Sequence, residues 1–154
     1  ITPEFSSGWN RTIAEVLLDN RSVRIGVWQM QVGRTTVYLM DTNVEENEPQ
    51  DRQLSARLYI ADRELRVQQE IVLGIGGVRV LRALGIKPAV WDANEGHAAF
   101  MMLERAREEI EQGATFDEAV KRVRKTTVFT THTPVPAGQD AFPVPLMDKY
   151  FLNV

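Results

Sequence analysis

The chain has no cysteine and only two histidines among its 154 residues. Without cysteine, disulfide bridges and thiolate metal sites are both excluded, which fits a reducing compartment. Basic residues are not in excess, because 18 Lys and Arg face 21 Asp and Glu. A nucleic-acid surface built on bulk positive charge is therefore not expected. No apolar run reaches the roughly 18 residues that a membrane-spanning helix needs, so we expect no membrane contact.

The two ends of the sequence also lack expected features. The chain does not begin with Met, and residues 1–5 have neither the basic nor the apolar segment of a secretory signal peptide. An apolar stretch at 145–154 closes the chain. We therefore expect a piece of a longer protein, a single domain fragment over 1–154. It would hold a β meander at about 12–41 and an α/β core at 62–143.

The first third of the chain reads as strands. Residues 23–32 alternate apolar and polar side chains, as a half-buried strand does. Gly33 and Arg34 make a tight turn into 35–40, which is rich in β-branched and aromatic residues. Residues 12–18 supply a third strand, although a helix over 12–20 also fits the spacing of its apolar residues. The acidic stretch 41–51 is expected to be a solvated loop.

The region 62–143 alternates helical and extended patterns. Apolar residues at helical spacing predict a helix over 62–84, which Gly85 ends. A buried strand is expected at 86–94 and a second one at 126–131. Between them lie a helix at 97–112 and a capped helix from Thr115 to about Arg124. The strand–helix–strand order predicts parallel pairing, hence an α/β fold in three layers with a mostly parallel sheet.

Three glycines interrupt the predicted helix at 74, 76 and 77. Each costs about 1 kcal/mol in a helix relative to alanine, so we expect a helix break or unusually tight packing there. A dinucleotide-binding loop would need a strand before it, whereas residues 64–70 are helical and charged.

Two polar segments follow the predicted strands and contain both histidines. Carboxyl ends of parallel strands meet at one edge of a sheet, so 94–97 and 130–138 form the candidate site. His97 is interpreted as a ligand-binding histidine at a helix start, with a purely structural histidine as the alternative. Asp92, Glu95 and His97 lack the spacing of a metal site, and Glu95 as the acid or base of a glycosidase stays open.

Other polar residues attract simpler interpretations. No serine lies in a nucleophile elbow. A solvated helix face with i,i+4 ion pairs is expected for Glu104, Arg105, Arg107, Glu108, Glu109 and Glu111.

The motifs, in this order and spacing, resemble the α-glucan (glycogen, starch, maltodextrin) phosphorylases, above all their short bacterial and archaeal branch. The matching stretches are 37–43, 57–59, 64–77, 94–100 and 130–138. The resemblance implies a Rossmann-like sheet in the N-terminal lobe of a GT-B glycosyltransferase. It also implies phosphorolysis, in which phosphate takes the terminal glucose of an α-1,4-glucan as glucose 1-phosphate. A cytoplasmic protein is implied as well.

The same resemblance assigns roles to individual residues. His132 matches the catalytic histidine that lies against the glucose at the point of cleavage. His97 and Glu95 match residues on the glucan acceptor side, and Arg66 matches an arginine at the mouth of that pocket. Asp62 matches a substrate-binding acidic residue of a gate loop. No cofactor-binding or metal-binding residue is carried over, because the lysine that holds pyridoxal phosphate belongs to a C-terminal lobe outside this chain.

The sequence departs from the family at several positions. Asp92, Asp62 after Ala61, and 139–141 differ from the usual pattern, and the glycine-rich loop that faces the cofactor phosphate lies outside the chain. The fragment is expected to be inactive alone, with α-glucan, phosphate and the missing lobe as its partners, and a homo-oligomer stays open. Alternatives are a non-catalytic carbohydrate-binding module and a sugar-nucleotide-dependent GT-B glycosyltransferase.

Overall fold

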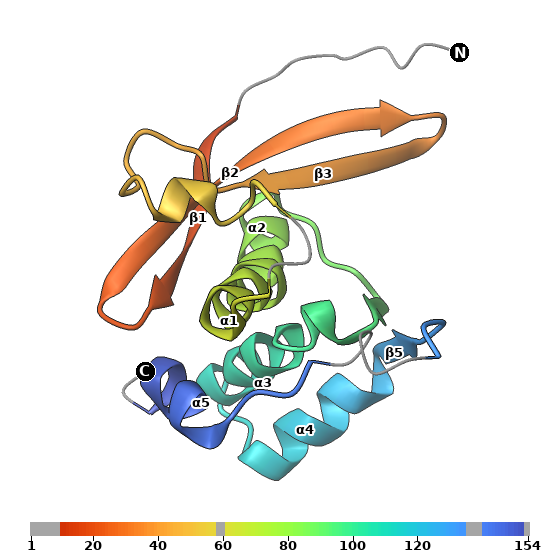
Figure 1. Ribbon diagram of the computed structural model, residues 1–154. Coiled ribbons are helices and arrows are strands. Elements are labelled where there is room, and N and C mark those ends of the chain that lie inside the picture. Colours follow the sequence, from red (N-terminus) through yellow and green to blue (C-terminus); the bar gives the residue numbers. More distant parts are fainter. Residues whose placement is uncertain (1–9, 58–60, 135–139, 153–154) are drawn as a thin grey trace.

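An antiparallel three-stranded sheet forms one face of the molecule (Figure 1). The computed structural model describes residues 10–57, 61–134 and 140–152, with the side chains of 10–13 left aside. The strands pair in sequence order and are β1 (Asn10–Leu18), β2 (Arg21–Val32) and β3 (Thr35–Asp41). The predicted meander is thus confirmed, and the alternative helix over 12–20 is wrong.

A single long helical rod lies against this sheet. It consists of α1 (Arg63–Ile71), the π-helical segment η2 (Val72–Gly76) and α2 (Gly77–Ala83). The predicted helix over 62–84 is confirmed, and Gly85 follows it with a φ of +73°, a left-handed conformation typical of helix ends.

The glycines of η2 allow close packing on both sides of the rod. A Cβ on Gly74 would lie 2.8 Å from the backbone nitrogen of Met101, and one on Gly76 would lie 2.4 Å from Cδ1 of Ile25. Tight packing is therefore confirmed as the reason for these residues. The chain does not break there but passes through one wider π-helical turn, a feature that often accompanies functional sites.

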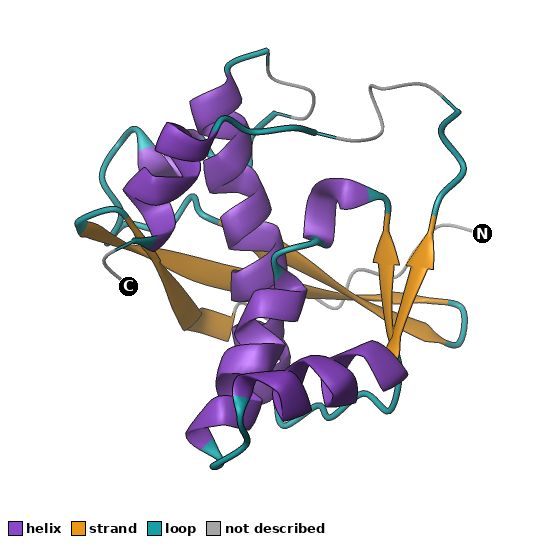
Figure 2. Ribbon diagram, turned by 90° about the horizontal axis from the view of Figure 1, so that it is seen from below, coloured by secondary structure: helices purple, strands orange, loops and turns teal. Residues whose placement is uncertain are grey.

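The second sheet holds two parallel strands, seen side by side in Figure 2. Asn94 pairs with Thr130 at their carboxyl ends. The unit runs through β4 (Trp91–Asn94), η3 (Gly96–Ala98), α3 (Met101–Glu111), α4 (Phe116–Lys125) and β5 (Thr127–Thr130). The predicted strand–helix–strand order and the Thr115 capping box are both confirmed, but the strand expected to be buried over 86–94 begins only at Trp91, and its alternate residues are exposed.

The share of strands in the parallel and the antiparallel sheet differs from the prediction. The fold is mixed α/β, but three of the five strands in the described residues belong to the antiparallel sheet. The reason lies in the segment after residue 62, which contains only two strand-forming stretches and so supplies a single parallel pair. A mostly parallel, Rossmann-like sheet is not found within the described part of the chain.

One helix was not predicted. After Pro143, α5 (Val144–Phe151) packs beside α1 and α3. Its Tyr150 is buried, and the phenolic oxygen accepts a hydrogen bond from Nε2 of Gln68 at 2.6 Å. Pro145 lies in the first turn of this helix, where the fixed φ of proline is favourable, so a signal was present in the sequence.

The acidic segment after β3 is more ordered than expected. A short helix, η1 (Asp51–Gln53), lies in it. Asp51 is buried and accepts hydrogen bonds from Nε of Arg21 at 2.9 and 3.0 Å. Asn47 is also buried and bonds to the main chain of Arg24 on β2. The interpretation as a solvated loop is wrong here, because these side chains fasten the segment to the sheet.

The prediction that the charged face of α3 is fully solvated is wrong in part. Glu104 is buried and accepts hydrogen bonds from Arg79 and Arg107. Arg105 is buried too, with its guanidinium 4.9 Å from the centre of the Trp91 ring. The expected i,i+4 pair between Arg107 and Glu111 is present. The face is therefore partly a packing surface, and sequence spacing alone did not distinguish the two sides.

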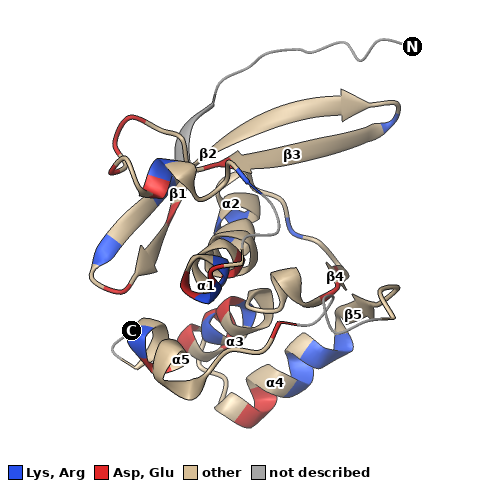
Figure 3. Ribbon diagram, in the orientation of Figure 1, with Lys and Arg blue, Asp and Glu red and all other residues tan. Residues whose placement is uncertain are grey.

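Charges on α4 follow the helix dipole, with acidic residues at its start and basic residues at its end (Figure 3).

The main hydrophobic core lies between the antiparallel sheet and the helical rod, and a smaller one includes residues of β4. The main cluster contains Val16, Leu18, Val23, Ile25, Val27, Leu54, Val67, Ile71, Val72, Val80 and Tyr150. Within the described residues, every helix is too short or too polar to cross a bilayer.

Candidate functional site

The carboxyl ends of β4 and β5 bring the two polar segments together. The backbone nitrogen of Glu95 donates to the carbonyl of Thr130 at 2.9 Å, which continues the parallel pairing by one residue. The residues after each strand therefore lie next to one another. This arrangement confirms the expectation that 94–97 and 130–134 meet at one edge of the sheet; 135–138 lie outside the described residues.

The Glu95 carboxylate is the centre of this edge. Its Oε1 accepts hydrogen bonds from the backbone nitrogens of His132 and Thr133, both at 2.8 Å. Its Oε2 accepts one from the hydroxyl of Thr131 at 3.1 Å. The residue is only 3% exposed. A buried carboxylate is thus satisfied by three successive residues of the other segment.

These donors lower the pKa of Glu95 to about 2, led by the backbone N–H of His132 and opposed by burial. Donors that bind the charged form of a carboxyl group stabilise it. The carboxylate is therefore ionised at neutral pH. This argues against Glu95 as the general acid of a glycosidase, since such an acid needs a raised pKa.

The backbone of Glu95 is strained. Its φ of 60° and ψ of −167° lie in a region that essentially only glycine adopts. Such a conformation costs on the order of 1–3 kcal/mol and persists only where the surroundings fix it. Here the hydrogen bonds at both the backbone and the side chain of Glu95 fix it.

His132 stands at the surface of this edge. Its side chain is 63% exposed. Its Nε2 lies 2.9 Å from Oδ1 of Asn94, and its Nδ1 lies 3.3 Å from Oε1 of Glu95. The hydrogen bond to the amide oxygen requires Nε2 to carry the proton. The imidazole is thus accessible to a ligand while its backbone is held.

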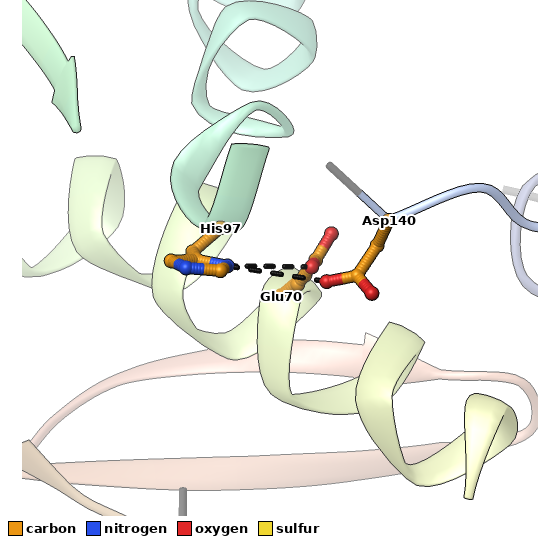
Figure 4. Close-up of side chains that lie close together, drawn as sticks. All are labelled: Glu70, His97 and Asp140. Carbon is orange, nitrogen blue, oxygen red and sulfur yellow. Dashed lines mark ion pairs between the residues drawn. The ribbon is translucent and has the colours of Figure 1, made fainter. Parts of the chain in front are cut away.

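His97 lies in a different group, which we name the Arg66 cluster: Arg66, Glu70, His97 and Asp140. Figure 4 shows how the side chains of Glu70, His97 and Asp140 approach one another. Arg66 donates from Nε to Oδ2 of Asp140 at 2.8 Å, and its Nη2 lies 2.5 Å from Nδ1 of His97. The same Nε is 3.3 Å from Oε1 of Glu70. The guanidinium therefore holds together side chains from α1, η3 and the segment before α5.

The pKa values of the two carboxyl groups in the Arg66 cluster are shifted in opposite directions. Burial, together with the nearby Asp140 carboxylate, raises the pKa of Glu70 to about 8, against the opposing effect of Arg66. Burial also acts to raise the pKa of Asp140, but hydrogen bonds led by that from Arg66 hold it below its ordinary value. At neutral pH, Glu70 is therefore largely protonated, and Asp140 balances the charge of Arg66.

The Arg66 cluster has the residue types of a metal site, because its two carboxyl groups and one imidazole offer ligand atoms within 4.8 Å of one another. Arg66 already supplies a permanent positive charge between them, and Nδ1 of His97 accepts from that guanidinium. A divalent ion would have to displace Arg66. The arrangement fits an ion-paired cluster better than a metal centre.

A cavity of about 630 Å³ opens beside the Arg66 cluster. Its wall is mostly apolar, formed by β3, the helical rod and the start of α3, with Arg57, Arg66, Glu70 and His97 at its polar part. Ligand sites commonly combine an apolar wall with a few polar groups. His97 lines this cavity, whereas His132 and Glu95 do not, so the two histidines serve different surfaces.

The remaining predicted residue, Asp62, caps α1. Its Oδ1 accepts from the backbone nitrogens of Glu64 and Leu65 at 2.8 and 3.0 Å. Arg66 and His97 are brought together as predicted, whereas Asp62 is not among the residues that line the cavity. Sequence reasoning missed Glu70 and Asp140. The spacing of four from Arg66 to Glu70 was a signal for the first, and none existed for the second.

Comparison with known proteins identifies the relatives. No family model and no solved structure matches the chain. It is 49% identical to maltodextrin phosphorylase of Thermococcus litoralis over 137 residues, which are 89% of this chain and 16% of that protein. It is 42% identical to glycogen phosphorylase of Aquifex aeolicus over 139 residues, 90% of this chain and 20% of the relative.

A third relative agrees with these two. Glycogen phosphorylase of Mycobacterium tuberculosis is 47% identical over 145 residues, 90% of this chain and 17% of that protein. The chain thus spans a fifth or less of the length of these three relatives. The resemblance to the α-glucan phosphorylases is confirmed over about nine tenths of this chain, which corresponds to one segment of such a protein.

Proposed function

We propose that this chain is a domain fragment from the N-terminal lobe of a GT-B type α-glucan phosphorylase. The complete enzyme releases glucose 1-phosphate from glycogen, starch or maltodextrin, with inorganic phosphate as the second substrate. The observation that carries the proposal is the identity of 42–49% to glycogen and maltodextrin phosphorylases across nearly the whole chain. The site at the ends of β4 and β5 is the part of the reaction centre that this fragment contributes.

His132 is the residue that meets the sugar at the point of cleavage. Its exposed imidazole offers hydrogen bonds to a glucose hydroxyl, and its backbone carbonyl offers partial negative charge. A fixed dipole near developing positive charge stabilises a transition state without reorganisation cost. The anchored backbone and accessible ring at this position support that role.

The cavity beside the Arg66 cluster is the proposed acceptor side for the glucan. Sugar rings combine apolar faces with hydroxyl groups, which suits a wall of apolar side chains with Arg66 and His97 at one part. Asp62 is proposed to act from the adjoining loop. Glu95 lies two residues before His97 in sequence, and three of its acceptor positions are already used by the protein.

Pyridoxal phosphate is the cofactor that the family implies. A Schiff base needs a lysine, and the cavity is lined by arginines but by no lysine. The lining of this cavity therefore does not fit a covalently held cofactor, and no step of the reaction is assigned to it. Its lysine belongs to the C-terminal lobe in our proposal.

The test compares this chain with the full-length protein. Each is incubated with maltodextrin and phosphate, and release of glucose 1-phosphate is measured. The full-length protein should turn over, the 154-residue chain should not, and activity should return only when the missing parts of the protein, including the C-terminal lobe, are supplied. Turnover by this chain alone would contradict the fragment proposal. A full-length protein that only binds glucan would favour a carbohydrate-binding module, and one that requires ADP-glucose would favour a sugar-nucleotide transferase.

A further inference from the structure

Glu95 combines two features that rarely occur together without a purpose. Its backbone adopts a conformation suited to glycine, with φ 60° and ψ −167°. Yet the residue is a glutamate whose side chain is buried and fully engaged. Strained residues persist where the surrounding structure over-determines them, and they cluster at active sites. The strain therefore points to a role for the side chain that glycine could not supply.

The contacts of the side chain indicate that role. Its hydrogen-bond donors in the described part of the chain come from Thr131, His132 and Thr133, the residues that leave β5. The main chain of Glu95 is itself fixed by its bond to Thr130. One residue thus joins the ends of β4 and β5 through both its backbone and its carboxylate.

The peptide group between His132 and Thr133 is the element that this contact orients. A trans peptide is planar, and its N–H and C=O point in opposite directions. No cis peptide is present in the described residues. Because the N–H of Thr133 points at Oε1 of Glu95, the carbonyl of His132 must point away from the carboxylate. The N–H of His132 fixes the preceding peptide in the same manner.

We propose that Glu95 is the positioning residue of this site, setting the direction of the His132 carbonyl and the placement of its imidazole. Glu95 acts through His132 and does not need to contact the sugar. Asn94 completes the arrangement by holding Nε2 of the ring. The consequence for turnover rests on the proposed phosphorolysis, whereas the orientation of the two peptide groups does not.

Three substitutions in the full-length enzyme separate positioning from structural support. Glu95→Gly removes the side chain and relieves the backbone strain, while Glu95→Ala removes the side chain and keeps the strain. Glu95→Gln keeps an oxygen that can accept both backbone N–H groups. Glu118→Gln is the matched control, because Glu118 also accepts from a backbone nitrogen and a threonine hydroxyl, but on α4.

We expect kcat for phosphorolysis to fall at least tenfold in both Glu95→Gly and Glu95→Ala, with KM for maltodextrin within about threefold. Glu95→Gly should melt at a higher temperature than Glu95→Ala. Glu95→Gln should keep kcat within about threefold, and Glu118→Gln should match the wild type. Recovery of kcat in Glu95→Gly along with its stability would overturn the proposal, since that pattern belongs to a purely structural residue.

Crystal structures of the same variants provide a readout that does not depend on activity. The peptide between residues 132 and 133 should be rotated or unfixed in Glu95→Gly and unchanged in Glu95→Gln. An unchanged peptide in Glu95→Gly would refute the positioning role. If the wild-type enzyme performs no phosphorolysis, the proposed function fails, and the structures alone still decide the role of Glu95.

Discussion

The two histidines of this chain occupy similar places in the sequence and very different places in the structure. His97 is held by its side chain, with Arg66 as its partner and two carboxyl groups about 4 Å away. His132 is held through its backbone by Glu95, and its ring is mostly exposed. A histidine in an ion-paired cluster contributes to stability, whereas one with an anchored backbone and an exposed ring is suited to binding. Substitutions on each side can test this difference.

The largest effect is expected at Arg66. Arg66→Ala leaves Asp140, whose side chain is one-third exposed, without its cation, and it removes the positive charge beside the buried Glu70. Removing one partner of a buried ion pair costs about 3–5 kcal/mol. Urea unfolding of the variant should show a loss near the lower value, because Asp140 is partly exposed. A loss below about 0.5 kcal/mol would mean that the cluster does not hold α1, η3 and the segment before α5 together.

A smaller effect, on the kinetics of the full-length enzyme, is expected for substitution of His132. In the full-length enzyme, His132→Ala should lower kcat/KM by about 1–3 kcal/mol, the scale of a lost polar contact. Its exposed ring contributes little packing, so the melting temperature should barely change. A fall of about ten degrees, corresponding to several kcal/mol in a chain of this size, with intact kinetics would show that His132 is structural.

Glu70 is expected to make the stability of the folded chain depend on pH. Its pKa is raised to about 8 in the folded chain from an ordinary value of 4.5. The folded state therefore binds more protons than the unfolded state between these values, and stability falls as pH rises through that window. Glu70→Gln should remove this contribution and raise the free energy of unfolding at pH 9 by about 1–3 kcal/mol relative to its effect at pH 4. Parallel pH profiles for the two proteins would contradict the assignment.

The smallest effect is expected at His97. His97→Ala removes one partner of Arg66 while Asp140 remains, so unfolding should be easier by about 1 kcal/mol, the scale of a single hydrogen bond. In the full-length enzyme, KM for long glucans should rise with little change in kcat, because an acceptor-side contact serves ground state and transition state alike. A fall in kcat with unchanged KM would place His97 with the reacting atoms instead.

Much of the fold followed from periodicity in the sequence. Alternation at 23–32 predicted β2, and helical spacing from Leu65 to Leu84 predicted the rod. What failed was the environment of charged residues. Glu104, Asp51 and Glu70 were all interpreted as polar surface or left without a role, yet each is buried beside an arginine that is distant in sequence or one turn away. A charge pattern does not reveal which charges find a buried partner.

Part of the candidate site could be predicted from the sequence, and part could not. Parallel strands bring their carboxyl ends together, so the meeting of Glu95 and His132 could be anticipated. The glycine-like backbone of Glu95 could not, because nothing in the letters Asn-Glu-Gly-His shows that the strain falls on the glutamate rather than on Gly96. Asp140 was equally hidden, since its partner Arg66 lies 74 residues away.

The anchoring of His132 has a consequence for the order of folding. Glu95 and His132 are 37 residues apart, and α3 and α4 lie between them. We therefore expect their contact to close only after both helices have formed and β4 has paired with β5. Contacts between distant residues pay their loop-closure entropy late in folding. Glu95→Ala should therefore speed unfolding and leave the folding rate nearly unchanged, and slower folding in stopped-flow measurements would contradict this. The binding edge would then be one of the last parts of the molecule to form and the first to open.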